Sequence, residues 1–292
     1  MRDFSSQGLP SLVIDYHGDM ALDAAPGTLI INAADGLPFS PFEVKGMGPN
    51  ASNEAAWEIS EILGVVFSLG EIQRTSVYEA LQQAYSLNFL NGELVRLPTI
   101  AEFTEQIELV EVRNKVKNIK ARLRPMLDFG LFPDEIDANF DLLASQGVII
   151  DLSGIGLSEV QLAASAFMLR KIYHDMFSWP QDKRMRLAIV LDEAHRMAKD
   201  VTLPKLMKEG RKYGVSVVVA SQGVEDFNSQ VLENAGVKIA FRTNFPASKK
   251  VASRLRGKGT EDLSANLEQL GVGEAYVSTP DHAQARKVYM FE

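Results

Sequence analysis

Two adjacent carboxylates, Asp192 and Glu193, are the residues of this chain whose types and spacing best suit catalysis. They follow the apolar run LAIVL at 187–191, so a buried strand is predicted to end in two negative charges. Hydrolysis of a nucleoside triphosphate uses such a pair, because one carboxylate holds Mg²⁺ and the other orients or deprotonates the attacking water. An ordinary strand with a polar end, or a helix N-cap, is the alternative interpretation of the same residues.

A second apolar run favours the chemical interpretation. Val215–Ala220 follows a basic segment and Gly214, and it ends in Ser221 and Gln222. In an open parallel α/β sheet, ligands bind outside the carboxyl ends of the strands. Two strands that both end in polar residues therefore predict a site at that edge.

The elements that must position these residues form an α/β pattern. Five short segments rich in Val, Ile and Leu do not alternate with polar residues, which is typical of strands in a parallel sheet covered on both faces. Helical patterns separate most of them, and Thr28–Ile31 is predicted to be a further short edge strand. The five predicted strands are Ser11–Asp15, Gly147–Leu152, Leu187–Asp192, Val215–Ser221 and Val237–Arg242.

Residues 51–145 differ from the rest because they carry helical periodicity throughout. Ser76 and Glu79 have the spacing of a capping box, and Gly92 is expected to follow the end of that helix. We therefore predict a first part of the core at 1–50, an all-helical insertion at 51–145 and the remainder of the core at 146–292. The predicted helices are Ala51–Phe67, Ser76–Phe89, Ile100–Val110 and Glu111–Leu127.

Composition narrows the class of protein. The chain has 292 residues, of which 46% are hydrophobic and 23% charged, as in a soluble globular protein. It contains no apolar run long enough to span a membrane and no signal peptide, and its lack of cysteine fits a cytoplasmic protein. Its net charge of −8 argues against a wholly basic nucleic-acid binder, so DNA contacts must come from local patches.

Two basic clusters are candidates for such patches. In the helix predicted at 111–127, a basic stripe runs beside an apolar one; it is either a phosphate-contacting face or a solvated helix face. The second cluster includes RGKG at 256–259, which is not a phosphate-binding loop because Gly259 stands where Ser or Thr is needed. The first stripe consists of Arg113, Lys117, Lys120 and Arg124, and the second cluster of Lys249, Lys250, Arg254, Arg256 and Lys258.

In family order, the segments of this chain resemble the HerA/FtsK-type branch of RecA-like P-loop ATPases, particularly HerA-like DNA translocases. The resemblance covers nearly the whole chain and implies a RecA-like, mostly parallel sheet flanked by helices, with an all-helical insertion. The matching segments are LVIDYHGD (12–19), LPFSPFE (37–43), GVIIDLSGIG (147–156), LAIVLDEAH (187–195), EGRKYGVSVVVASQ (209–222), ENAGVKIAFRTN (233–244) and LGVGEAYVS (270–278).

The resemblance implies a role for each matching polar residue. Asp192 would hold Mg²⁺ through water, and Glu193 would be the catalytic base. Gln222 would sense the γ-phosphate of ATP or position the attacking water. Arg211 resembles an arginine finger offered to the ATP of a neighbouring subunit, although a cation that binds helix C-terminal carbonyls is the alternative interpretation. Lys212, the next residue, is the alternative candidate for the role of Arg211.

Further residues are expected near the nucleotide. Arg242 would be a second sensing arginine, and the segment from Asp15 to Asp19, with His17 in it, would lie near the nucleotide edge. We do not expect this segment to bind zinc, because no second set of metal ligands stands near His17 in the sequence. Asp151 and Ser153 are expected at the same edge.

The chain departs from the family at one essential place. A strand, a GxxxxGK(S/T) loop and a helix come before LVIDYHGD in the family, whereas only MRDFSSQGLP precedes it in these 292 residues. The missing Walker A strand and loop would cradle the phosphates and help hold Mg²⁺. We therefore expect this chain alone to be inactive and to be part of a larger protein, through truncation or a split gene.

Three functions follow from these observations. The first is the motor portion of a homo-hexameric ring ATPase that translocates double-stranded DNA, either in DNA-end processing with a partner nuclease or in prokaryotic antiviral defence and restriction. The second is a type IV secretion or conjugation ATPase, which shares the fold and most motifs. The third is a non-hydrolysing assembly or adaptor module, which would have no need to keep Asp192, Glu193, Arg211 and Gln222 together.

Overall fold

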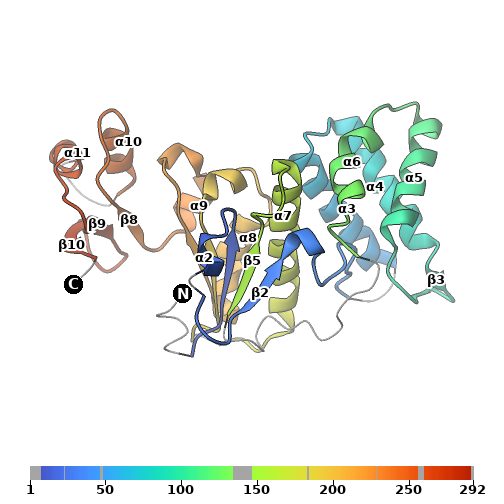
Figure 1. Cartoon of the computed structure of the whole chain (residues 1–292), viewed down its shortest axis with the longest axis horizontal. Helices are drawn as coiled ribbons and strands as arrows, with labels where there is room; N and C mark the ends of the chain where they lie inside the picture. The colour runs from blue at the N-terminus through green and yellow to red at the C-terminus, as the bar shows by residue number, and fades with distance from the viewer. Residues whose placement is uncertain are drawn as a thin grey trace. The chain divides into compact units, whose positions relative to one another are not determined.

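The structure of the chain is a computed structural model (Figure 1). Contacts divide the chain into two compact units. The first unit comprises Met1–Asp192 and Lys199–Val219, and the second comprises Glu193–Ala198 and Ala220–Glu292. The predicted three-part organisation of the core and its insertion stays a prediction. The structure describes residues 8–22, 24–46, 49–133, 147–182, 184–227, 229–255 and 260–290.

A parallel sheet forms the centre of the first unit, as the apolar, non-alternating segments predicted. Its strand order is β2-β5-β1-β6-β7, so the predicted short edge strand does lie at an edge. All five residues of β1 are buried, and other strands of the sheet pair with it on both sides. The strands are β1 (Ser11–Asp15), β2 (Leu29–Asn32), β5 (Val148–Asp151), β6 (Leu187–Leu191) and β7 (Val215–Val219).

Short helices and one long helix accompany this sheet. In the long helix, α7 (Ser158–Asp175), eleven residues are buried. Strands that alternate with helices produce the predicted α/β class. The other elements are α2 (Asp19–Leu22), η1 (Ala33–Asp35), η2 (Met176–Ser178), α8 (Leu203–Glu209) and η4 (Gly210–Tyr213).

The predicted insertion is helical and belongs to the first unit, where Figure 1 shows its helices gathered together. The capping box predicted at Ser76 is wrong, since Ser76 is buried inside a helix that begins at Glu71. The sequence does contain a capping box at Thr99 and Glu102, with reciprocal bonds of 2.9 and 3.1 Å. The elements are α3 (Pro49–Val66), α4 (Glu71–Ser86), β3 (Phe89–Leu90), β4 (Glu93–Leu94), α5 (Ile100–Asn114) and α6 (Ile119–Phe129).

The helix predicted at Glu111–Leu127 is also wrong, because the chain breaks within it. Helix α5 runs on to Asn114, and Lys115 and Asn118 both adopt left-handed backbone angles before α6 begins. Left-handed residues end a helix, since L-residues do not propagate that conformation. The predicted basic stripe is consequently divided between two helices and the turn between them.

The second unit has an antiparallel sheet of order β10-β9-β8. The predicted fifth strand is shorter than expected and pairs with β9 rather than joining the parallel sheet. A small core of Ala240, Ala252, Leu255, Leu267 and Leu270 holds this unit together. Its elements are η3 (Ala194–Met197), η5 (Val224–Asp226), α9 (Ser229–Asn234), β8 (Lys238–Ala240), α10 (Ala247–Arg254), α11 (Thr260–Glu268), β9 (Glu274–Ser278) and β10 (Arg286–Tyr289).

Strand β7 is less buried than its composition predicted. Its sequence is VSVVV, which is typical of an interior strand, yet it is the last strand in the order of its sheet and Val218 is 43% exposed.

Among the described helices, none is long and apolar enough to cross a membrane.

Candidate functional site

Polar residues line the carboxyl edge of the parallel sheet, as the strand ends predicted. Asp15 is paired in register with Asp151, and Asp151 with Asn32. Asp192 comes directly after Leu191, whose register partner on β1 is Ile14. The row of strand ends across β2, β5, β1 and β6 therefore reads Asn, Asp, Asp, Asp, which concentrates negative charge at one edge.

The carboxylate of Asp15 is committed to shaping the turn after β1. It is 4% exposed and accepts backbone N–H bonds from His17, Gly18, Met20 and Ala21, at 2.9 to 3.2 Å. Four such bonds use the acceptor positions of the carboxylate. Asp15 thus stabilises the turn after β1, and His17 within that turn is exposed.

The turns after β1 and β5 pack closely against each other. Asp151 accepts the backbone N–H of Ser153 at 2.9 Å. Gly18 has φ +79°, and a Cβ there would lie 2.8 Å from the Ser153 hydroxyl. Only glycine meets both the angle and the close approach, which explains the HGD sequence.

Asp192 remains as the predicted ligand of Mg²⁺ at this edge. The described residues contain no group of three or more His, Asp or Glu side chains that could hold a metal by themselves. Mg²⁺ in nucleotide sites is held by one or two carboxylates, by water and by the phosphates, so a single strand-end aspartate fits that arrangement. The roles of Asp192 and of the other candidate residues stay predictions.

Glu193 begins the second unit in an unusual backbone conformation. Its φ is +54° and ψ +43°, values that a residue other than glycine adopts only when its surroundings hold it there. The next residue, Ala194, donates its backbone N–H to the carbonyl of Ala220 at 2.7 Å. The turn of Glu193 is thereby tied to the segment that leads to Gln222.

His195 contacts the Glu193 carboxylate, which the sequence analysis did not predict. Its Nδ1 lies 3.1 Å from Oε2 of Glu193, and the two side chains are 41% and 19% exposed. The sequence does place a histidine two residues after the proposed base Glu193. Only the tight turn between them shows that the two side chains are in contact.

Gln222 is exposed in a loop that Asp226 stabilises. Asp226 accepts bonds from the Ser221 hydroxyl at 2.8 Å and from the Gly223 N–H at 2.9 Å. The residues on both sides of Gln222 are thus fixed, and its amide is left on the surface of the second unit.

Arg211 and Lys212 lie at the opposite end of the parallel sheet from Asp192. Both are exposed on η4, which directly precedes β7, and Val215 is paired in register with Leu187, the first residue of β6. A five-residue strand separates the two ends by roughly 16 Å. Arg211 therefore cannot reach a nucleotide at Asp192 of its own chain, which leaves the predicted role on a neighbouring subunit.

An aromatic stack supports the turn that carries Arg211. The rings of Tyr213 and Phe177 are 5.3 Å apart, and those of Phe177 and Tyr173 are 5.1 Å apart. The Tyr173 hydroxyl donates to Glu209 at 3.3 Å. Burial, and then the nearby Glu209 carboxylate, raises the pKa of Tyr173 to about 12, so it remains a neutral donor.

The basic cluster of the second unit is partly paired. Lys250 forms an ion pair with Glu225 at 3.0 Å, and Lys249 lies over the ring of Phe245, 5.2 Å from its centre. Arg242 and Arg254 are exposed, after β8 and at the end of α10. Arg256 and Lys258 lie outside the described residues.

The basic residues of the insertion are mostly paired. Arg113 binds Glu79 at 2.8 Å, Arg124 binds Asp128 at 2.7 Å and Lys120 contacts Glu108, whereas Lys117 is exposed. Ion pairs reduce the attraction of a cation for phosphate. The insertion therefore offers fewer available charges than its sequence indicated.

Comparisons with known proteins agree with this geometry. The DNA double-strand break repair helicase HerA of Sulfolobus acidocaldarius is 24% identical over 290 residues, covering 91% of this chain and 56% of that protein. HerA of Sulfurisphaera tokodaii is 28% identical over 181 residues, covering 57% and 35%. The chain thus spans about half the length or less of these relatives. A family model described as the TraM recognition site of TraD and TraG matches residues 186–288.

Solved structures resemble nearly the whole chain. VirB4 of Thermoanaerobacter pseudethanolicus has a TM-score of 0.74 and 17% identity, covering 98% of this chain and 83% of that chain. The bacterial conjugative coupling protein TrwB has a TM-score of 0.67 and 16% identity, covering 98% and 80%.

The helix-flanked parallel sheet defines a RecA-like α/β fold. In sequence the chain is similar to the HerA helicases, and in fold it is similar to VirB4 and TrwB. These likenesses support a HerA/FtsK-type P-loop ATPase fragment.

Proposed function

We propose that this chain is the motor portion of a HerA-like ATPase that uses ATP and Mg²⁺ to translocate double-stranded DNA. The observation that carries the proposal is the acidic carboxyl edge, where Asp192 ends the row of strand-end residues and Glu193 follows in a strained turn. Relatives named as DNA repair helicases support the choice of substrate. DNA-end processing is the setting that these names favour, and we propose a partner nuclease for it.

Each proposed catalytic residue has one task. Asp192 would hold Mg²⁺ through water, and the bound ion would supply positive charge beside the phosphates. The Glu193 carboxylate takes a proton from the attacking water. Gln222 holds that water or senses the γ-phosphate, and Arg242 is a further sensing residue.

Arg211 acts on a neighbouring subunit. Its position at the end of the sheet opposite Asp192 supports action in trans, which requires a ring, and we propose a homo-hexamer. A guanidinium offered across the subunit interface would stabilise charge on the transferring phosphoryl oxygens. Lys212, on the same turn, is the alternative candidate for this role.

A strand that carries the phosphate-binding loop would fit beside β7. No described strand pairs with the outer side of β7, which has the apolar sequence VSVVV without the charge or proline that usually protects an edge. We propose that the Walker A strand pairs there and that hydrolysis requires it. This chain alone is expected not to hydrolyse ATP.

The decisive test compares Glu193 with its neutral isostere. ATP binding is measured for this chain alone, and DNA-stimulated ATP hydrolysis for the proposed longer protein that includes the Walker A segment. Glu193→Gln should reduce kcat at least a hundredfold with little change in ATP affinity, because it removes the base and keeps the shape. Equal hydrolysis by the wild type and the variant would refute the catalytic assignment.

A second candidate is a type IV secretion or conjugation ATPase. The family match at residues 186–288 and the structural similarity to VirB4 and TrwB favour it. ATP hydrolysis that duplex DNA stimulates by itself would support the translocase, whereas a requirement for a protein or nucleoprotein substrate would support the second candidate. A longer protein without any hydrolysis would indicate the adaptor module.

A further inference from the structure

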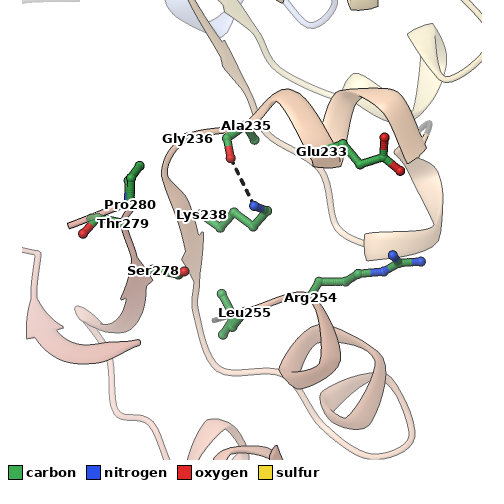
Figure 2. A pocket seen from close by; sticks show the side chains of 9 residues that line it. All are labelled: Glu233, Ala235, Gly236, Lys238, Arg254, Leu255, Ser278, Thr279 and Pro280. Carbon is green, nitrogen blue, oxygen red and sulfur yellow. Dashed lines mark hydrogen bonds between the residues drawn. The ribbon is translucent and has the colours of Figure 1, made fainter. Parts of the chain in front are cut away.

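The second unit contains a cavity that none of the proposed catalytic residues lines. Its volume is about 320 Å³, and it lies between the end of α9, the start of β8, the end of α10 and the turn after β9. Figure 2 shows the charged side chains around it, which are those of Lys238, Arg254 and Glu233. Lys238 was not among the residues predicted from the sequence.

Lys238 is held in place at this cavity. Its ammonium group donates to the carbonyl of Ala235 at 3.0 Å, and the side chain is only partly exposed (Figure 2). An ammonium group has three N–H donors, so this bond leaves two for a further acceptor. Because the anchoring carbonyl is neutral, the positive charge of Lys238 is not cancelled.

Within the described part of the chain, neither Lys238 nor Arg254 forms an ion pair with a carboxylate. At two other cavities the lining cations do form ion pairs, since Arg96 is paired with Glu102 and Arg124 with Asp128. The cavity of the second unit therefore contains two cations that form no ion pair among the described residues, although the carboxylate of Glu233 also lines it.

The distribution of charge along the sequence points the same way. Residues 220–292 contain nine Lys and Arg and nine Asp and Glu, so they are neutral, while the whole chain carries −8. A neutral unit in an acidic protein repels an anionic polymer less than the remainder does. An anion thus meets its smallest electrostatic barrier at this unit.

We propose that this cavity binds a phosphate group of the DNA backbone, through Lys238 and Arg254. Lysine provides a compact point charge, and the arginine fork matches two phosphate oxygens. None of the lining residues is aromatic, so the cavity has no platform on which a base could stack, as a nucleotide site would favour. The inference rests on the proposed DNA translocation and adds a backbone contact to it.

Glu233 allows a second test, in which the expected change in DNA affinity is opposite. Its carboxylate lines the same cavity and would repel a phosphate. Removal of a cation should weaken DNA binding, whereas Glu233→Gln should strengthen it. General damage to the fold would not produce this pair of effects.

The test measures binding of a fluorescently labelled DNA duplex to the full chain by anisotropy at several salt concentrations. Lys238→Ala and Arg254→Ala should each weaken binding about fivefold and lower the slope of log affinity against log salt by about 0.9. Glu233→Gln should tighten binding about twofold. Lys287→Ala is the matched control, because Lys287 is paired with Glu274 at 2.8 Å in the same unit, and its slope should stay that of the wild type.

The outcomes separate this proposal from the proposed function. If the wild type binds duplex but both alanine variants keep its affinity and salt slope, the cavity is not the contact, while DNA translocation stands. If the wild type does not bind duplex, both fail. If ATP binds to the wild type but not to Lys238→Ala, and duplex binding is insensitive to the substitution, the phosphate comes from a nucleotide and the DNA assignment is wrong.

Discussion

The two units of this protein use their charged residues differently. In the first unit a buried cation is satisfied by the protein itself, since Arg170 is 4% exposed and contacts the Glu58 carboxylate at 3.2 Å. In the second unit Lys238 and Arg254 face a cavity without a carboxylate partner among the described residues. The difference indicates that Arg170 stabilises the first unit, whereas Lys238 and Arg254 are available for a ligand in the second.

The largest expected effect concerns Arg170. It also donates to the carbonyls of Pro41 and Glu43, so Arg170→Met would leave several buried groups without a partner. We expect a loss of about 3–5 kcal/mol in the free energy of unfolding, measured with urea. Arg124→Ala, which breaks an exposed pair, should cause no measurable change. Equal stability of the two variants would break the comparison.

The next effect concerns Asp200, the buried carboxylate that accepts the N–H groups of Thr202 and Leu203. Burial raises the pKa of Asp200 to about 6, against the lowering effect of those bonds. Its protonation therefore stabilises the fold fully below about pH 4, and that stability is lost as the pH rises through about 6. Asp200→Asn should be about 2 kcal/mol more stable than the wild type at pH 7.5.

The measurement for Asp200 is the free energy of unfolding across pH 4 to 8. The wild type should lose stability between pH 4 and 6 relative to Asp200→Asn, whose amide does not titrate and keeps the acceptor. Parallel curves for the two proteins would mean that Asp200 is not a buried, destabilised charge.

A smaller effect is expected at His195, in the second unit. His195→Ala removes the contact to Glu193 and should lower kcat for ATP about tenfold in the hydrolysing longer protein, with unchanged KM and melting temperature. His195→Asn should restore much of the rate, because its side-chain N–H takes the place of Nδ1, whereas His195→Gln should not. A rate unaffected by His195→Ala would show that Glu193 needs no such support.

The smallest effect is expected from the insertion. Arg113→Ala should change duplex affinity less than about twofold, because Glu79 already holds that guanidinium. Lys117→Ala should weaken binding more, since Lys117 is exposed and its side chain has no ion pair among the described residues. The measurement is anisotropy at low salt. An effect of Arg113→Ala as large as that of Lys238→Ala would place the main DNA contact on the insertion.

Local pattern predicted the parallel sheet well. Ser11–Asp15 was predicted to the residue, and the other strands of that sheet within two residues, because short buried strands have a composition that solvent-exposed segments lack. The break between α5 and α6 was not predicted, since Lys115 and Asn118 carry no strong signal for left-handed backbone. The capping box was misplaced for a similar reason, as Ser76 has the right spacing in a helix that starts earlier.

By itself the sequence determined which residues end the strands of the parallel sheet, because strand composition and strand ends are local properties. The order of its motifs also indicated the resemblance to HerA/FtsK-type ATPases. Only the tertiary structure showed that the Asp15 carboxylate accepts backbone bonds within its own turn. It also showed that Arg211 lies at the end of the parallel sheet opposite Asp192, and that Arg113 forms an ion pair with Glu79. It also decided that Lys238 reaches the cavity that Arg254 lines. Those facts depend on contacts between residues distant in the chain, which no local pattern encodes.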